Sequence, residues 1–387
     1  MVWYNSGMAT ENTSSATPRY VVDERALRRN LEILKDVSER TGARILLAQK
    51  AYSCGATYPL CARYLAGTTA SSLFEARHGH DKFGGETHVF APAFVPGEMD
   101  ELLSLVDHIV FNSPRQVALF GAAARAKGVS VGLRVNPEVS VATTPAYDPC
   151  RPSSRLGTRR ADLGAADRLE LDGLHFHCLC EQGVDELRKV LAGFEERFGD
   201  MLPSLKWVNF GGGHHITRAD YDVDGLVALV SDFRSRHPHL DVYLEPGEAI
   251  ALNAGTLESR VLEIQPRGGD GVANAILDTS AACHMPDVIE MPYTPRVVGA
   301  KIGAAGPHAY RFGGPTCLAG DEIGTYSFDR PLTEGDIVVF EDMAIYSMVK
   351  NNTFNGLNLP AIALRHEDGS VETLRTFGYS DFAVRLA

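Results

Sequence analysis

The sequence predicts an α/β protein in which a (β/α)8 barrel of the TIM type is followed by a mostly β domain. From Arg19 to about Ala249, short apolar runs alternate with amphipathic segments, as in a parallel sheet whose strands are joined by helices. Beyond Ala249, β-runs follow one another between Gly, Pro and Asp turns. Residues that can do chemistry stand where the apolar runs end, and a barrel gathers its functional groups at the strand ends.

The composition is that of a globular protein with room for two or three domains, since 44% of its 387 residues are hydrophobic. There are 37 basic side chains against 49 acidic ones, which gives a formal net charge of −12. Nucleic acids and anionic membranes need clustered Lys and Arg, so we expect neither as the main partner. A cationic small-molecule substrate is compatible with this charge.

We expect a cytoplasmic protein. No window approaches the roughly 18 apolar residues of a membrane span, and the first residues lack the basic and apolar regions of a secretory signal. The cysteines are odd in number and form no small-domain framework, so we expect reduced thiols. They are Cys54, Cys61, Cys150, Cys178, Cys180, Cys283 and Cys317.

The chain is predicted to divide into a tail and two domains. Residues 1–17 are rich in Ser, Thr, Ala and Asn, which indicates a mobile tail. The barrel is expected over residues 18–250 and the β domain over 251–387. The first apolar run, residues 19–23, either opens the barrel or joins the β domain.

Eight apolar runs supply the strands of the predicted barrel. They lie at residues 43–50, 67–72, 88–94, 108–113, 131–137, 171–178, 205–213 and 242–248. Amphipathic segments fit the helices at residues 24–42, 58–67, 73–84 and 185–202. Residues 138–160 contain three prolines and many small side chains, so we expect a long loop near the barrel mouth.

The predicted β domain consists of apolar runs bounded by turn residues. These runs lie at residues 256–266, 271–280, 295–303, 309–314, 336–342, 362–369 and 371–378.

Lys50 is the first candidate for chemistry because it follows the apolar run ILLA, which places an amine at the end of a buried strand. A partly desolvated lysine loses some preference for its charged form and can attack an aldehyde, as in a cofactor Schiff base. The alternative is a lysine that only reaches from a strand end to solvent, and Lys50 alone would favour it.

Three glycines, Gly211, Gly212 and Gly213, follow the run KWVNF. Backbone N–H groups without a nearby Cβ can approach a phosphate, and such a nest after a strand is a common phosphate cradle. The spacing matches neither a dinucleotide fingerprint nor a P-loop. A plain glycine turn is an equally good interpretation of this motif by itself.

Glu245 ends another apolar run, in VYLEPGE. A carboxylate at the mouth of a barrel can hold a pyridinium N–H and keep a cofactor ring electron-withdrawing. A helix cap or a surface acid before a Pro-Gly turn is the alternative.

His175 and His177 share one face of a predicted strand. The words HFH and CLC could suggest a metal, but no second cluster with zinc spacing follows, and no metal site is expected. One of the two rings is expected to stack on a cofactor and the other to form a hydrogen-bonded core histidine. The sequence does not say which.

The loop GGPTCLAGD in the predicted β domain carries Cys317 and Asp321. A thiol held in a tight turn can donate a proton, and a nearby carboxylate can meet a cationic substrate. A small buried hydrophobe is the commoner role of a lone cysteine.

The order of these motifs resembles the fold-type III pyridoxal-phosphate decarboxylases, the group of alanine racemase and of ornithine and diaminopimelate decarboxylases. The resemblance covers roughly residues 18–387. Within the group, the words AQKAYSC, GTTASSLFEAR, GLHFHCLCEQ, NFGGGHHIT, LEPGEA, HMPDVIEMPY and GPTCLAGD look like the carboxynorspermidine/carboxyspermidine decarboxylases. This resemblance implies pyridoxal phosphate as the cofactor and decarboxylation in polyamine biosynthesis as the activity.

The resemblance also implies residue roles. Lys50 would form the Schiff base, His177 would stack on the cofactor ring and Glu245 would pair with the pyridine nitrogen. The three glycines would hold the phosphate, with Tyr346 near it. Cys317 would protonate the carbanion carbon after CO2 leaves. Members of this group share their active sites between two subunits, so the resemblance implies a homodimer.

One departure concerns Glu248, since ornithine-type relatives have a phosphate-binding arginine after EPG. An acid there makes sense if it binds the cationic amines of the substrate. Asp287 is the second expected amine ligand, with Glu290 and Asp321 as helpers. Arg155 resembles a loop residue of relatives that pairs across the dimer, and no catalytic role is expected for it.

Other functions stay open. A relative acting on diaminopimelate, ornithine or arginine is the first alternative, although a second substrate carboxylate would require an arginine clamp rather than Glu248 and Asp287. A racemase is disfavoured because Glu245 favours a protonated ring. A non-catalytic cofactor-binding relative and a His/Cys metal-binding protein complete the alternatives. The sequence does not choose between carboxynorspermidine and carboxyspermidine, which differ by one methylene.

Overall fold

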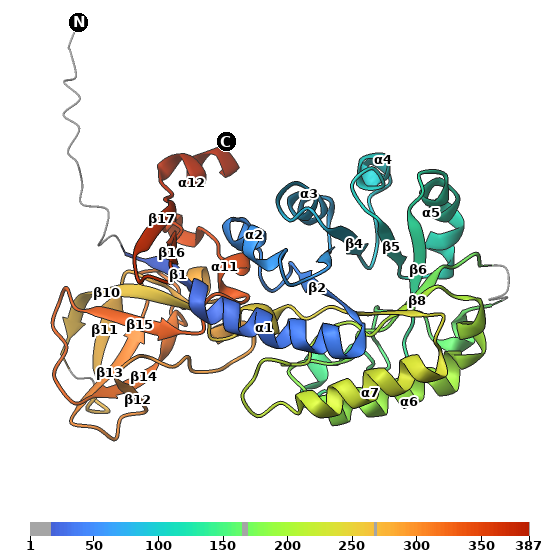
Figure 1. Ribbon diagram of the computed structural model, residues 1–387. Helices are drawn as coiled ribbons and strands as arrows, with labels where there is room; N and C mark the ends of the chain where they lie inside the picture. Colours follow the sequence, from blue (N-terminus) through green and yellow to red (C-terminus); the bar gives the residue numbers. More distant parts are fainter. Residues whose placement is uncertain (1–16, 165–168, 267–268, 387) are drawn as a thin grey trace, which may run out of the picture. The chain divides into compact units, whose positions relative to one another are not determined.

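A computed structural model describes residues 17–164, 169–266 and 269–386 of the protein (Figure 1). Residues 1–16, nearly all of the predicted tail, lie outside this described part. The chain forms two compact units, and the first of them is Ala26–Leu252. In the second unit, the residues up to Arg25 join Asn253–Ala387.

The first unit is a closed barrel of eight parallel strands, which confirms the predicted fold class. Its strands are β2 (Arg44–Ala48), β3 (Gly67–Ala70), β4 (Glu86–Phe90), β5 (His108–Phe111), β6 (Ser130–Arg134), β7 (Gly173–His175), β8 (Trp207–Asn209) and β9 (Asp241–Leu244). The pairing of Arg44 with Tyr243 joins β2 to β9 and closes the ring. All eight carboxyl ends therefore meet at one rim.

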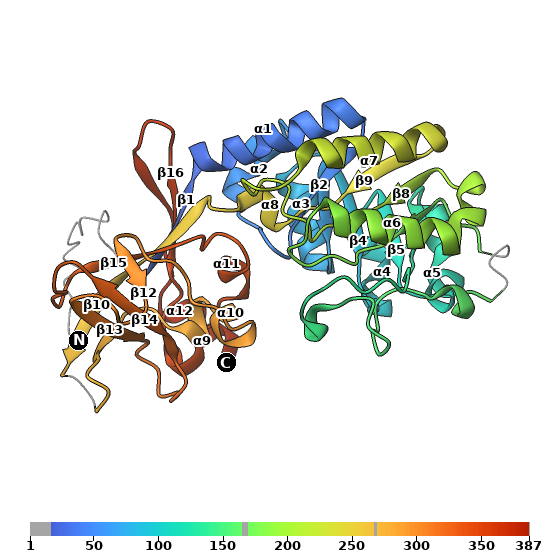
Figure 2. The same cartoon turned by 90° about the horizontal axis from the view of Figure 1, so that it is seen from below.

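Helices follow the strands and cover the barrel. They are α1 (Glu24–Thr41), α2 (Tyr58–Cys61), α3 (Leu73–Lys82), α4 (Met99–Leu102), α5 (Pro114–Ala126), α6 (Val184–Phe198), α7 (Val223–Arg236) and α8 (Glu248–Ala251). Figure 2 shows α6 and α7 running side by side along the outside of the strands. Side-chain caps start several of these helices, as when Ser72 accepts the N–H of Glu75 at 3.2 Å.

The long segment between β6 and β7 is irregular, as predicted for residues 138–160. Its described part contains the short 3-10 turns Pro145–Tyr147 and Arg160–Asp162. No helix among the described residues is both long and apolar enough to cross a membrane.

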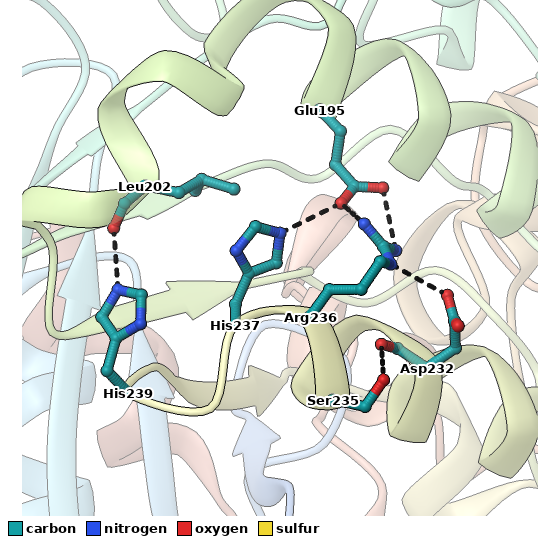
Figure 3. Close-up of polar contacts among 7 residues, drawn as sticks. All are labelled: Glu195, Leu202, Asp232, Ser235, Arg236, His237 and His239. Carbon is teal, nitrogen blue, oxygen red and sulfur yellow. Dashed lines mark hydrogen bonds and ion pairs between the residues drawn. The ribbon is translucent and has the colours of Figure 1, made fainter.

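Polar contacts fasten α7 to α6 just before β9 begins (Figure 3). The guanidinium of Arg236 pairs with Glu195 of α6, with Nη2 and Oε2 3.1 Å apart, and Nε donates to Asp232 at 3.1 Å. His237 Nε2 lies 3.3 Å from the same Glu195, and His239 Nε2 lies 3.1 Å from the carbonyl oxygen of Leu202. Exposed pairs of this kind contribute about 1 kcal/mol or less each, so they orient the chain entering β9 more than they stabilise the barrel.

Trp207 fills the inside of the barrel because two neighbouring strands carry glycine beside it. A Cβ on Gly173 of β7 would lie 2.0 Å from the indole ring, and one on Gly132 of β6 would lie 2.3 Å from it. The indole Nε1 donates to Ser130 Oγ at 2.9 Å. The glycines are thus required by the volume of Trp207, which packs with Leu46, Val110 and Tyr243.

The second unit is built on a nine-stranded sheet in the order β12-β14-β13-β11-β10-β1-β16-β17, with β15 paired to β10. Its strands are β1 (Arg19–Asp23), β10 (Gly255–Gln265), β11 (Ala273–Leu277), β12 (Ala300–Ile302), β13 (His308–Gly313), β14 (Glu322–Phe328), β15 (Ile337–Glu341), β16 (Ala361–Arg365) and β17 (Val371–Arg375). Its short helices are α9 (Ala281–His284), α10 (Asp287–Glu290), α11 (Ser347–Lys350) and α12 (Tyr379–Leu386).

Two strands of this sheet differ from what the sequence analysis predicted. Strand β1, counted with the barrel at residues 18–250, lies antiparallel to β10 and parallel to β16. Residues 19–23 therefore join the β domain, which was the second of the two placements that the sequence allowed. Strand β14 was not predicted, because Gly324 interrupts its apolar alternation and charged residues flank it. It is recruited by pairing with both β12 and β13.

We predict that Gly173→Ala destabilises the protein by about 1–3 kcal/mol, because the added Cβ overlaps the Trp207 ring and the barrel cannot widen locally. Gly97→Ala is the matched control, since nothing lies within 4 Å of its added Cβ. Urea unfolding measures both variants. Equal stability of the two would show that the indole can move aside.

Candidate active site

Lys50 comes directly after β2, at the carboxyl rim of the barrel. Its side chain is exposed to solvent, yet the surrounding barrel atoms remove enough water to lower the pKa of the amine. The positive charge of Arg134 lowers the pKa further, while the carboxylates of Glu248 and Glu245 act in the opposite direction. The side chain is therefore both reachable and closer to its nucleophilic neutral form than a free lysine.

Arg134, the last residue of β6, is a member of this rim that sequence analysis missed. It is 5% exposed, and burial lowers its pKa to about 10. Nη2 donates to the carbonyl oxygen of His177 at 2.9 Å, and the guanidinium lies 4.5 Å from the centre of the Phe90 ring. Its position could have identified it, because Arg134 is a charged residue at the end of the apolar run VGLR.

Glu245 follows β9 and carries a negative charge inside the barrel. Burial alone would raise the pKa of this carboxyl group, but His175 and a hydrogen bond from Asn209 outweigh burial and bring it to about 2. Asn209 Nδ2 donates to Oε1 at 2.8 Å, and His175 Nε2 lies 3.2 Å from Oε2. Burial lowers the pKa of His175, while the charge of Glu245 acts in the opposite direction.

The two histidines of HFH have different environments. His175 is 1% exposed, and neither ring nitrogen makes a hydrogen bond to another described residue. His177 is partly exposed, and its Nδ1 accepts the N–H of Gly212 at 3.1 Å. That bond leaves the ring proton on Nε2 and fixes the orientation of the ring. His177 is thus the histidine that is both anchored and accessible.

The glycine loop after β8 needs glycine for packing as well as for conformation. Gly211 and Gly213 have φ angles of 71° and 85°. A Cβ on Gly212 would lie 2.0 Å from the carbonyl oxygen of Glu245, and one on Gly213 equally close to that of Leu179. Each substitution would therefore push the loop away from the neighbouring strand ends.

Only part of this loop can serve an external anion. The N–H of Gly211 donates to Asn209 Oδ1 at 2.8 Å, and that of Gly212 is held by His177. The next two N–H groups, of Gly213 and His214, donate to no other described residue. Buried His214 also has an Nε2 without a hydrogen-bond partner in this part of the chain. Free donors at a strand end suit a phosphate group.

Glu248 lies at the start of α8 and is paired with His215. His215 Nε2 and Glu248 Oε2 are 2.9 Å apart. Burial lowers the pKa of His215, but the hydrogen bond and the charge of Glu248 outweigh it, so the net shift is upward. Sequence analysis did not single out His215, although it follows the glycine loop. The Glu248 carboxylate therefore has a histidine partner whose protonated form it favours.

The remaining candidates belong to the second unit. Cys317 is exposed, and its N–H donates to Asn355 Oδ1 at 2.8 Å. Asp321 is 4% exposed and accepts hydrogen bonds from Ser280 Oγ at 2.9 Å and Thr316 Oγ1 at 2.6 Å. The buried carboxylate thus holds the loop on which the accessible thiol stands.

Asp287 and Glu290, both in α10, form ion pairs with the same ammonium group, that of Lys350. Burial lowers the pKa of Lys350, but these two hydrogen-bonded carboxylates outweigh it and raise the pKa. Tyr346, with a positive φ of 48°, precedes α11.

The structure thus brings together part of the predicted site. Around the barrel rim it gathers the lysine, the accessible histidine, the glycine loop and two carboxylates: Lys50, His177, Gly211, Gly212, Gly213, Glu245 and Glu248. In the second unit it joins Asp287 to Glu290, and it places Asp321 beneath the loop of Cys317. An accessible lysine beside free N–H donors and a buried carboxylate fits a phosphorylated pyridine aldehyde.

Residues 19–344 match the family described as pyridoxal-dependent decarboxylase, C-terminal sheet domain. The chain belongs to the pyridoxal-dependent decarboxylases. The family resemblance and the expected enzyme class, a carboxy-lyase, are thereby confirmed.

Relatives of this decarboxylase match it over nearly their full lengths. A carboxynorspermidine/carboxyspermidine decarboxylase of Campylobacter jejuni is 42% identical, spanning 95% of this chain and 98% of that protein. A carboxyaminopropylagmatine decarboxylase of Synechocystis is 41% identical, spanning 97% of this chain and 96% of that protein. The crystal structure of the Campylobacter jejuni carboxynorspermidine decarboxylase complexed with norspermidine superposes with a TM-score of 0.89 at 41% identity. The superposition covers 96% of this chain and all of the Campylobacter jejuni chain.

We predict that Glu248→Gln costs this decarboxylase roughly 1 kcal/mol more stability at about pH 6 than at about pH 9. The folded pKa of His215 is raised, so its pairing with Glu248 stabilises the fold fully below the unfolded pKa. That contribution is lost as the pH rises through the folded pKa. Urea unfolding at the two pH values measures it.

The control for this measurement is Glu39→Gln, because Glu39 forms an exposed ion pair with Lys35, which is not a histidine. The control should show no such pH-dependent difference. Equal losses in Glu248→Gln at both pH values would mean that His215 does not change its protonation state between them.

Proposed function

We propose that this enzyme uses pyridoxal 5′-phosphate to decarboxylate carboxynorspermidine or carboxyspermidine, yielding norspermidine or spermidine. The observation that carries the proposal is the accessible Lys50 amine, of lowered pKa, on the same barrel rim as the buried, ionised Glu245. The names of the full-length relatives support the substrate class. Carboxyaminopropylagmatine is the second candidate substrate, because a relative named for it is about as similar to this chain.

The barrel rim offers one group for each part of the cofactor. Lys50 would bind its aldehyde carbon, and the partly exposed ring of His177 would lie against the pyridine. The free N–H groups of Gly213 and His214 would hold the phosphate, with Tyr346 near it. When bound, the cofactor supplies an electron sink for the carbanion that remains when CO2 leaves.

The proposed roles of the chain's own side chains follow from their protonation. Ionised Glu245 would keep a proton on the pyridine nitrogen, since a buried carboxylate favours a cationic partner. The lowered pKa of Lys50 would let its amine bind the aldehyde and exchange with the substrate amine near neutral pH. Burial and the positive charge of Arg134 keep the pKa of Lys50 low.

We propose a phosphate-binding role for the pair of His215 and Glu248 in place of the arginine of ornithine-type relatives. His215 adjoins His214, whose N–H is free, and Glu248 favours the protonated imidazole. A protonated imidazole beside two N–H donors attracts a phosphate. Glu248, expected from the sequence to bind a substrate amine, would then act mainly through His215.

The substrate amines would meet the carboxylates of the second unit. Asp287 and Glu290 already bind the ammonium group of Lys350, so we propose that these carboxylates also bind an ammonium group of an extended polyamine. Asp321 would contribute by holding its loop rather than by direct contact, because its oxygens already accept hydrogen bonds. Cys317 on that loop would donate the proton to the carbanion carbon.

A homodimer is part of this proposal, with each partner supplying the Cys317 loop to the other's barrel. We also propose the cytoplasm as the working compartment. Support comes from the cysteines, which are all free thiols in the described residues, as expected in a reducing compartment.

The first prediction of this proposal concerns the substrate. Purified holoenzyme should release CO2 from carboxynorspermidine or carboxyspermidine at least about tenfold faster than from diaminopimelate or ornithine, because the simple diamino acids lack the extended cationic chain. Carboxyaminopropylagmatine belongs in the same assay. Lys50→Ala should abolish release, while the exposed control Lys82→Ala should keep it.

The substrate panel separates the alternatives. Release from diaminopimelate or ornithine alone would overturn the roles of Asp287 and Glu290 but keep the cofactor site. Faster release from carboxyaminopropylagmatine would favour the second candidate. Near-normal turnover in Lys50→Ala would contradict the proposal altogether.

The second prediction tests the shared active site. Lys50→Ala and Cys317→Ala should each be nearly inactive alone. Mixed in equal amounts and allowed to exchange subunits, they should recover about a quarter of wild-type CO2 release, since half of the dimers then hold one intact site. No recovery despite subunit exchange, measured with differently tagged chains, would place both residues of each site on one chain.

A further inference from the structure

A second cluster of ligand-type side chains lies at the opposite end of the barrel from Lys50. Glu86 begins β4, His88 follows two residues later, and His108 begins β5. His88 and His108 are paired in the register of the two strands. Residues two apart on a strand share a face, so the pattern Glu-x-His and the neighbouring His converge on one point at the amino ends of the strands.

The three side chains offer a compact set of donors. One ligand atom from each lies within 4.8 Å of the other two. His88 is 1% exposed, and its Nδ1 makes no hydrogen bond to the rest of the described chain. The same holds for the buried Nδ1 of His108. Buried polar nitrogens without partners are uncommon and call for an explanation.

Burial and nearby charged groups both act on His108. Burial and His88 lower the pKa of His108 to about 3. Glu86 also pairs with Arg44, and Asp172 is the other charged group that acts on His108. Arg44 is a competitor for Glu86, but its side chain is 44% exposed and can turn into solvent.

We propose that Glu86, His88 and His108 bind one divalent transition-metal ion of the zinc type. Two imidazole nitrogens and a carboxylate oxygen are a common donor set for such ions, and water completes a four-coordinate site. Bond lengths of about 2.0–2.1 Å place two donors about 3.4 Å apart, so the present donors must approach by little more than 1 Å. Partly exposed Glu86 and His108 give the ion access.

Binding requires one ring to turn. The rings of His88 and His108 are stacked 4.0 Å apart at an angle of 7°, and a single ion cannot lie in two parallel ring planes. His108 is the ring free to rotate, because the His88 ring is held at Nε2, 3.2 Å from Glu86 Oε2, whereas His108 Nδ1 has no hydrogen bond to break. The ion would then join β4 to β5 at the amino ends of these strands, next to the Tyr243 and Trp207 rings.

Titration calorimetry of the holoenzyme with Zn²⁺ tests this site. We expect one strong site per chain, weakened at least tenfold by Glu86→Gln and by His108→Phe. The latter keeps a ring in the stack without a donor. His80→Gln, an exposed histidine of α3, is the control and should bind like the wild type. Zn²⁺ should also raise the Tm of the wild type and not that of Glu86→Gln.

His175, His177 and Glu245 at the other rim form a second set of ligand-type side chains, which could compete for the ion. Binding at that second set would be unchanged in Glu86→Gln and His108→Phe, because neither substitution touches the rim that carries it. The two variants therefore distinguish the two sites in the holoenzyme. CO2 release at the wild-type rate establishes that each variant is folded. Absence of binding in the wild type would overturn the proposal. So would undiminished binding in both folded variants, and the histidines would then be a neutral packing pair.

Discussion

The negative charge of Glu245 inside the barrel is the constraint on which the rest of the rim depends. A buried carboxylate is costly unless hydrogen bonds and charges compensate for the lost water. Asn209 at the end of β8 donates a hydrogen bond to this carboxylate, and His175 at the end of β7 lies 3.2 Å from it. Three neighbouring strands must therefore end in register, and this register places the glycine loop and His177 beside Glu245. The same geometry lowers the pKa of Glu245 to about 2.

Basic side chains also lie near the rim, and each of them has a different effect. Arg134 is buried between Phe90 and the carbonyl oxygen of His177, where it opposes protonation of Lys50. His215 and Glu248 form their own pair at the edge of the glycine loop. The rim thus separates a reactive amine, a buried anion and a set of anion-binding donors, which together match the functional groups of a phosphorylated aldehyde cofactor.

Much of this arrangement could be predicted from the sequence, because local patterns specify it. Each barrel strand is a short apolar run, and Lys50 and Glu245 stand directly after such runs. Partners from distant strands could not be predicted. Arg134 is one residue of an ordinary apolar run, and only barrel closure brings it to Lys50. Strand β14 lacks a clear alternation and exists because β12 and β13 offer it backbone partners.

The sequence by itself determined the barrel, the β domain after it and the identity of the reactive side chains, since these depend on local periodicity and residue type. The tertiary structure decided the remaining points. It placed β1 in the sheet of the second unit, separated accessible His177 from buried His175, and matched the charge of Glu248 with His215. Each of these outcomes depends on strands and loops far apart in the chain, whose proximity arises only when the backbone hydrogen bonds of the sheets are made.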